Sequence, residues 1–191
     1  MSIVMIAILA VVVVVLVLIV GMVASGAIIC GDLMSYTATG AETMSPVGAV
    51  TGNALVVYQP GVTGAARTEA SEIASDLKAE GYNVTLAGIR SAAAANTSGY
   101  DIVIVGGPVY FGTVSSSTAA YLKGLTLQQD ARLGVFGTTG SNDFVASDLT
   151  SVEKQVATLQ SGKSAVVRLI GDRDEKKATK SCLDFVAALI K

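Results

Sequence analysis

The sequence has 191 residues, of which 51% are hydrophobic, 13 are basic and 15 are acidic. This length suits one ordinary domain with a short additional segment. The near balance of charge excludes the dense cationic face of a nucleic-acid-binding protein. With no histidine and two cysteines, the sequence also lacks the ligands for a zinc site and the partners for a Cys-His catalytic pair.

The N-terminal segment is the most hydrophobic part of the chain. No charged side chain occurs before Asp32, and residues 3–20 are almost entirely Ile, Val, Leu, Met and Ala. A helix over residues 3–29 would be about 40 Å long at 1.5 Å per residue, which exceeds the roughly 30 Å hydrocarbon core of a bilayer. We therefore predict one transmembrane helix within residues 1–30. It is retained rather than cleaved, because the basic start of a signal peptide is missing.

The rest of the chain divides into a linker and a domain. Residues 31–53 are rich in Gly, Ser, Thr and Ala without a regular apolar period, which predicts a flexible linker. From residue 54 to residue 191, short apolar runs alternate with helical patterns. Strands are predicted at residues 54–58, 83–87, 101–105, 132–136 and 165–170, and helices at 67–80, 115–123, 145–159 and 174–190. This alternation predicts an α/β fold with a five-stranded, doubly wound parallel sheet.

Three glycine-rich segments follow predicted strands, at the sheet edge where open α/β sheets bind ligands. The first segment (59–66) precedes a helix, whose free N–H groups and positive dipole end can bind phosphate. The second segment (106–113) carries Tyr110 and Phe111, on which a flat ring can stack. The third segment (137–144) offers small polar side chains. A purely structural alternative is that the first segment is an ordinary strand-to-helix turn and that the two aromatic rings cover the end of the sheet.

These segments make residues 53–191 resemble a short-chain flavodoxin-like domain. The resemblance rests on Ala-Leu-Val-Val-Tyr with the Thr63-Gly64 turn, on Val-Gly-Gly-Pro-Val-Tyr-Phe-Gly at 105–112, and on Gly-Val-Phe-Gly-Thr-Thr-Gly at 134–140. It implies the strand order 2-1-3-4-5 and FMN as cofactor, with the phosphate on the first segment and the isoalloxazine ring between the second and third. The cofactor-binding residues it implies are Gln59, Pro60, Gly61, Val62, Thr63, Gly64, Ala65, Ala66, Pro108, Val109, Tyr110, Phe111, Gly112, Thr138, Thr139, Gly140 and Asn142.

The first segment departs from the family pattern, which is rich in Ser and Thr. Here Thr63 and Thr68 are the remaining hydroxyl groups. Arg67, at the predicted helix start, either supplies a compensating positive charge or is an ordinary exposed helix residue.

The resulting functional hypothesis is a membrane-anchored protein that binds FMN noncovalently and transfers electrons at the membrane surface, with its domain on the cytoplasmic side. A quinone or a membrane redox protein is the expected partner, and no nucleic acid or metal is expected. No catalytic residue is predicted, since the sequence contains no histidine and no evident acid–base pair. The alternatives are an FMN-dependent quinone reductase or porphyrinogen oxidase, and a flavin-free binding module with the same fold.

Overall fold

The computed structural model describes residues 5, 11–21, 38–141, 143–160 and 164–191. The chain divides into two units, Met1–Ser35 and Tyr36–Lys191, and each is described by itself.

The first unit corrects the membrane prediction. Within this unit, residues 11–21 are helical. Across the described part of the chain, no helix has the length and apolar character needed to cross a membrane. This finding contradicts the predicted single-pass membrane localisation, and the predicted anchor is not supported by the described residues. The other positions of the predicted helix, apart from residue 5, lie outside the described residues.

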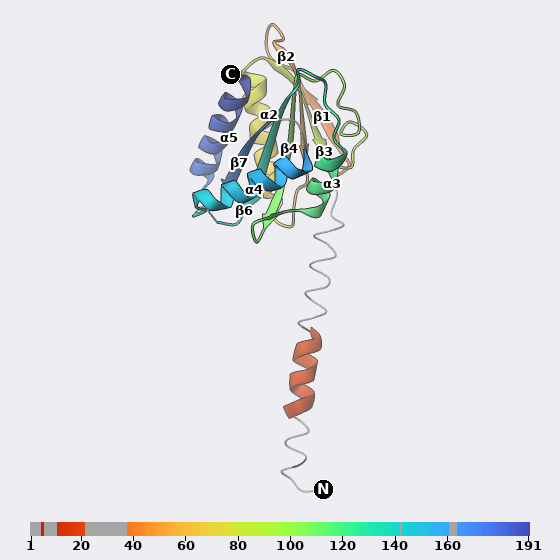
Figure 1. Cartoon of the computed structure of the whole chain (residues 1–191), viewed down its shortest axis with the longest axis vertical. Helices are drawn as coiled ribbons and strands as arrows, with labels where there is room; N and C mark the ends of the chain where they lie inside the picture. The colour runs from red at the N-terminus through yellow and green to blue at the C-terminus, as the bar shows by residue number, and fades with distance from the viewer. Residues whose placement is uncertain (1–4, 6–10, 22–37, 142, 161–163) are drawn as a thin grey trace. The chain divides into compact units, whose positions relative to one another are not determined.

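The second unit is built on a mostly parallel sheet with the strand order β1-β3-β2-β4-β6-β7, and β5 pairs with β4 outside this path (Figure 1). Its five parallel strands, in chain order, are β2 (Gly52–Tyr58), β3 (Tyr82–Gly88), β4 (Ile102–Tyr110), β6 (Arg132–Thr139) and β7 (Ala165–Gly171). Numbered among themselves these strands run 2-1-3-4-5, so the predicted order is confirmed. The predicted count of five is wrong, because the sheet has seven strands.

One of the two additional strands, β1 (Ala41–Met44), lies in the segment predicted as a flexible linker. It pairs antiparallel with β3, from Ala41 opposite Ala87 to Met44 opposite Val84. The pairing covers the backbone N–H and C=O groups that an edge strand would otherwise expose. The sequence hides this strand because its side chains are largely exposed and show no apolar alternation. The other addition, β5 (Thr113–Val114), pairs antiparallel with the end of β4.

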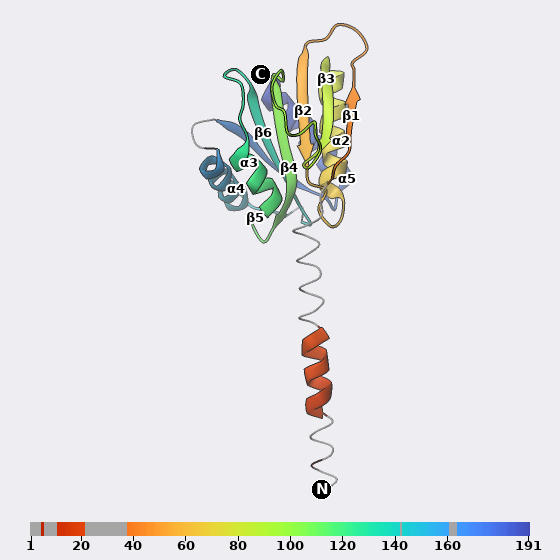
Figure 2. The ribbon, with the colours of Figure 1, turned by 90° about the vertical axis from the view of Figure 1, so that its right-hand side faces the viewer.

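Helices cover both faces of the sheet (Figure 2). Helices α2 (Ala65–Ala79) and α5 (Glu175–Ile190) pack on one face, and α3 (Ser116–Gly124) and α4 (Ala146–Leu159) lie on the other. Alternate residues of β2 serve the two cores: Val56 packs with the α2 and α5 side, and Val57 with the opposite side. Because these strands are buried on both faces, their sequences are continuous apolar runs.

Helix α2 carries one buried carboxyl group, that of Glu69, and one partly buried carboxyl group, that of Asp76. Glu69 is 5% exposed, and the buried thiol of Cys182 on α5 donates a hydrogen bond to Glu69 Oε2 at 3.1 Å. Burial raises the pKa of the Glu69 carboxyl, and burial together with Glu69 raises the pKa of the Cys182 thiol. The other group, Asp76, has a buried Oδ2 atom for which the described residues provide no hydrogen-bond partner.

Asp76 is expected to destabilise the fold when it is ionised. Burial, with smaller contributions from Glu72 and Glu80, raises the pKa of Asp76 to about 6. Because an unfolded aspartate titrates near pH 3.9, the folded state binds the proton more tightly, and the free energy of unfolding falls as the pH rises from about 4 to about 6. Because water screens this partly exposed group, we expect Asp76→Asn to raise the free energy of unfolding by only about 1–2 kcal/mol at pH 7, and by much less at pH 4. Urea unfolding across pH 4–8 measures this difference, and a difference that is independent of pH would contradict the expectation.

Candidate functional site

The three predicted segments meet at one edge of the sheet. They follow β2, β4 and β6, which are neighbours in the strand order. Because these strands are parallel, their carboxyl ends lie at the same edge. The Gln59 N–H donates to the Gly106 carbonyl at 2.9 Å, which ties the first segment directly to β4.

The first segment has a buried part and an exposed part. Gln59, Pro60 and Gly61 are buried, whereas Val62 and Thr63 are exposed. Of the predicted contacts, Gln59 has its side chain occupied within the protein. Its Oε1 accepts hydrogen bonds from the hydroxyl groups of Ser115 and Thr118, the latter at 3.3 Å, at the start of α3. This buried polar cluster is therefore structural, and sequence reasoning missed it.

The exposed part of the first segment leads into α2. Gly64 is the N-cap residue, with φ of 77°, and the Ala65 N–H donates to Thr63 Oγ1 at 3.3 Å. Within the described residues, the amides of Thr63, Gly64 and Ala66 have no hydrogen-bond partner. The first turn of α2 contains no acidic side chain. Unpaired amides at a helix N-terminus attract anions, so this turn is suited to a phosphate.

The second segment is a β-hairpin, which corrects the prediction that β4 ends at residue 105. β4 continues to Tyr110 and pairs with β5 through Val109 opposite Val114 and Tyr110 opposite Thr113. Phe111 and Gly112 form the turn, with φ of 52° and 76°. Positive φ at both central residues is characteristic of a type I′ turn, in which Asn-Gly is the favoured pair. Phe111 is thus an unusual residue in this conformation.

The two aromatic side chains of the hairpin have different surroundings. Tyr110 is partly buried, and a backbone hydrogen bond from Val62 joins its hydroxyl to the first segment. Burial nevertheless raises the pKa of Tyr110. Phe111 is fully exposed, at 107%. The alternative that both rings cover the end of the sheet therefore does not hold for Phe111, which projects into solvent.

The third segment turns back on itself through its own side chains. Thr138 is buried, and the Thr139 Oγ1 atom accepts a hydrogen bond from the Ser141 N–H at 3.1 Å. The Asp143 N–H donates to Ser141 Oγ at 3.1 Å. Gly140 is exposed next to this turn. The predicted contact Asn142 lies outside the described residues.

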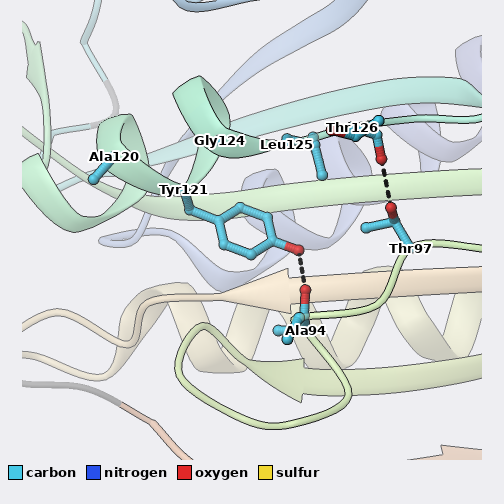
Figure 3. Close-up of a pocket in the computed structure, with 8 residues that line it drawn as sticks. Ala94, Thr97, Ala120, Tyr121, Gly124, Leu125 and Thr126 are labelled. Atoms are coloured by element: carbon cyan, nitrogen blue, oxygen red, sulfur yellow. Dashed lines mark hydrogen bonds between the residues drawn. The ribbon is translucent and has the colours of Figure 1, made fainter.

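A cavity of about 280 Å³ lies elsewhere, beside α3. It contains no residue of the three segments (Figure 3). The Tyr121 hydroxyl donates to the Ala94 carbonyl at 2.6 Å, and the Thr97 hydroxyl donates to the Thr126 carbonyl. Both hydroxyl groups in the wall of the cavity therefore donate hydrogen bonds to carbonyl groups in the same wall. The cavity is lined by Ala94, Ala95, Thr97, Ala120, Tyr121, Gly124, Leu125 and Thr126.

Comparisons with known proteins identify the fold. No protein-family profile and no curated protein sequence matches this chain. Among solved structures, the flavodoxin of Streptococcus pneumoniae TIGR4 is 18% identical with a TM-score of 0.52, over 72% of this chain and 97% of that one. Flavodoxin 2 from Bacillus cereus is 17% identical with a TM-score of 0.50, over 72% and 97%. The apo form of an NADH:FMN oxidoreductase is 14% identical with a TM-score of 0.52, over 73% and 90%.

At sequence identities of 14–18%, the similarity to these structures shows the fold alone. The second unit has a flavodoxin-like α/β fold, as the sequence resemblance implied. The candidate site must be argued from its own residues.

Proposed function

We propose that this domain binds FMN noncovalently at the three-segment edge and transfers electrons through it. The observation that carries the proposal is Phe111, an aromatic side chain that is fully exposed on a left-handed backbone at the carboxyl edge of the sheet. An exposed ring on a disfavoured backbone conformation has no evident benefit for the fold, and such residues concentrate at functional sites. A flat aromatic ligand stacked on Phe111 would supply that benefit.

The first segment fits the other end of FMN. The unpaired amides of Thr63 and Gly64 can donate to phosphate oxygens, and the Thr63 hydroxyl can add a further donor. Arg67, exposed in the first turn of α2, supplies positive charge there. These groups offset the small number of hydroxyl side chains in the segment.

The chain's own residues hold and orient the cofactor in this proposal. When bound, FMN supplies the capacity to accept and release electrons. Histidine, the residue most often used for proton transfer in catalysis, is absent from the sequence. This composition favours an electron carrier over an enzyme that turns over its own substrate.

A fluorescence titration of FMN and of riboflavin with the full chain tests the proposal. We expect saturable quenching with tighter binding of FMN, because riboflavin lacks the phosphate. We also expect Arg67→Gln to weaken FMN binding about 10- to 100-fold, since a hydrogen bond to a charged group contributes about 1.5–3 kcal/mol, and to leave riboflavin binding unchanged. Lys78→Gln, in the last turn of the same helix, is the matched control and should change neither affinity. Equal affinities for the two flavins, or no saturable quenching, would contradict the proposal.

A further inference from the structure

Gln155 of α4 makes two hydrogen bonds to the hairpin that carries Phe111. Its Nε2 donates to the Gly112 carbonyl at 2.8 Å, and its Oε1 accepts from the Val114 N–H at 3.1 Å. The Gly112 carbonyl can only accept a hydrogen bond, and the Val114 N–H can only donate one. These two partners therefore determine which atom of the Gln155 side chain is the oxygen and which is the nitrogen. The two bonds connect α4 to the turn itself, at Gly112, and to β5, at Val114.

Apart from Gln155, the base of the hairpin is held by the Ser115 N–H, which donates to the Pro108 carbonyl at 3.1 Å, by the buried side chain of Val114 and by the bond between Val62 and the Tyr110 hydroxyl. β4 and β5 are joined by two residue pairs, Val109 with Val114 and Tyr110 with Thr113. A short two-stranded hairpin is marginally stable in water. Phe111 adds an unfavourable conformation, since a residue with a Cβ atom is disfavoured at φ of 52°. The turn must therefore depend on contacts from outside the hairpin.

We infer that Gln155 is a positioning residue that holds the β4–β5 turn in its left-handed conformation and thereby presents Phe111 to the ligand. The role in ligand binding rests on the function proposed above. The role in the turn does not, because it follows from the two hydrogen bonds and the backbone conformation alone.

The chemistry of the side chain makes this inference testable. An amide offers a donor and an acceptor side by side, and an ionised carboxylate of the same shape offers acceptors alone. A carboxylate would still accept from the Val114 N–H, but it would face the Gly112 carbonyl without a proton to donate. A protonated carboxyl group regains both functions. The groups that bond to Gln155, namely the backbone of Gly112 and Val114 and the Ser151 hydroxyl at 3.5 Å, do not titrate in the physiological range.

The experiment compares the full chain with Gln155→Glu and Gln155→Met at pH 8 and pH 4. The first readout, independent of flavin, is the hydrogen-exchange protection factor of the Val114 amide. We expect it to fall at least 10-fold in both variants at pH 8. At pH 4 it should recover to within about 2-fold of the parent in Gln155→Glu and stay low in Gln155→Met. Glu153→Gln, an exposed change on the same helix, is the control and should leave the protection factor unchanged at both pH values.

The second readout is FMN affinity relative to the parent at the same pH. We expect about a 10-fold loss in both variants at pH 8 and recovery in Gln155→Glu alone at pH 4. Unchanged Val114 protection in both variants would overturn the inference, whatever FMN does. If the Val114 protection factor falls but the FMN affinity is unchanged, the inferred role of Gln155 in presenting Phe111 to the ligand would be overturned. If the parent protein binds no FMN, the proposed function fails, and the protection factors still decide whether Gln155 holds the turn.

Discussion

Replacing Phe111 with asparagine is expected to stabilise the flavin-free protein and to weaken FMN binding. The side chain is fully exposed, so its removal sacrifices no packing. Asn-Gly is the favoured pair for a turn with positive φ at both central residues, and a left-handed conformation costs an ordinary residue about 1–2 kcal/mol. We therefore expect Phe111→Asn to raise the free energy of unfolding by about 1 kcal/mol. Loss of a stacked ring, worth about 1–3 kcal/mol, should weaken FMN binding about 10- to 100-fold.

The opposite signs of these two effects separate a functional residue from an incidental one. Urea unfolding of the flavin-free chain measures the first effect, and titration with FMN measures the second. Val47→Asn is the control, because Val47 is also fully exposed but lies outside the three segments, and it should change neither quantity by much. A Phe111→Asn variant that is less stable than the parent, or that binds FMN equally well, would contradict the role assigned to this ring.

Gly106→Ala is expected to be the most destabilising single change in this part of the sheet. A Cβ atom at Gly106 would lie 1.9 Å from the ring of Phe136, its partner on β6, which is buried. That ring packs edge-on against Phe185 of α5 at a centroid distance of 6.4 Å, so it cannot move aside without disturbing the core. Overpacking of this kind typically costs about 1–3 kcal/mol and sometimes more, and we expect at least 3 kcal/mol here.

Two further variants show whether the overlap with Phe136 is the cause of the destabilisation. Gly140→Ala places a methyl group where no atom lies within 4 Å, and it should change the free energy of unfolding by less than about 0.5 kcal/mol. Combining Gly106→Ala with Phe136→Leu should cost less than the sum of the two single changes, because the smaller side chain relieves the overlap. Strictly additive costs in urea unfolding would show that the ring of Phe136 is not the obstacle.

The parallel core of the fold could be predicted from the sequence because its signals are local. Residues 102–105 form a continuous β-branched run, as expected for a strand buried on both faces, and the structure places all four in the core. β1 gave no such signal, since it is held by backbone pairing to β3, and its own side chains are mostly exposed. Pairing between segments about 40 residues apart leaves little mark on the sequence of the shorter strand.

The meeting of the three segments at one edge of the sheet could also be predicted, but the contacts of individual residues could not. Gln59 follows a strand as a ligand-binding residue would, yet its side chain bonds to Ser115 and Thr118, more than 50 residues away. Tyr110 and Phe111 are adjacent aromatic residues, and the sequence does not distinguish their roles. The turn at residue 111 gives the two side chains different surroundings. Phe-Gly is not a recognised signal for that turn, which depends on Gln155 in α4.

The central claim is that FMN binds at the edge formed by the three segments. Amide chemical shifts of the isotopically labelled full chain, followed during titration with FMN, test it most directly. We expect saturable changes that are largest at Thr63 and Gly64, at Phe111 and Gly112, and at Gly140. Saturable changes centred instead on the cavity beside Tyr121, or no changes at millimolar FMN, would contradict it.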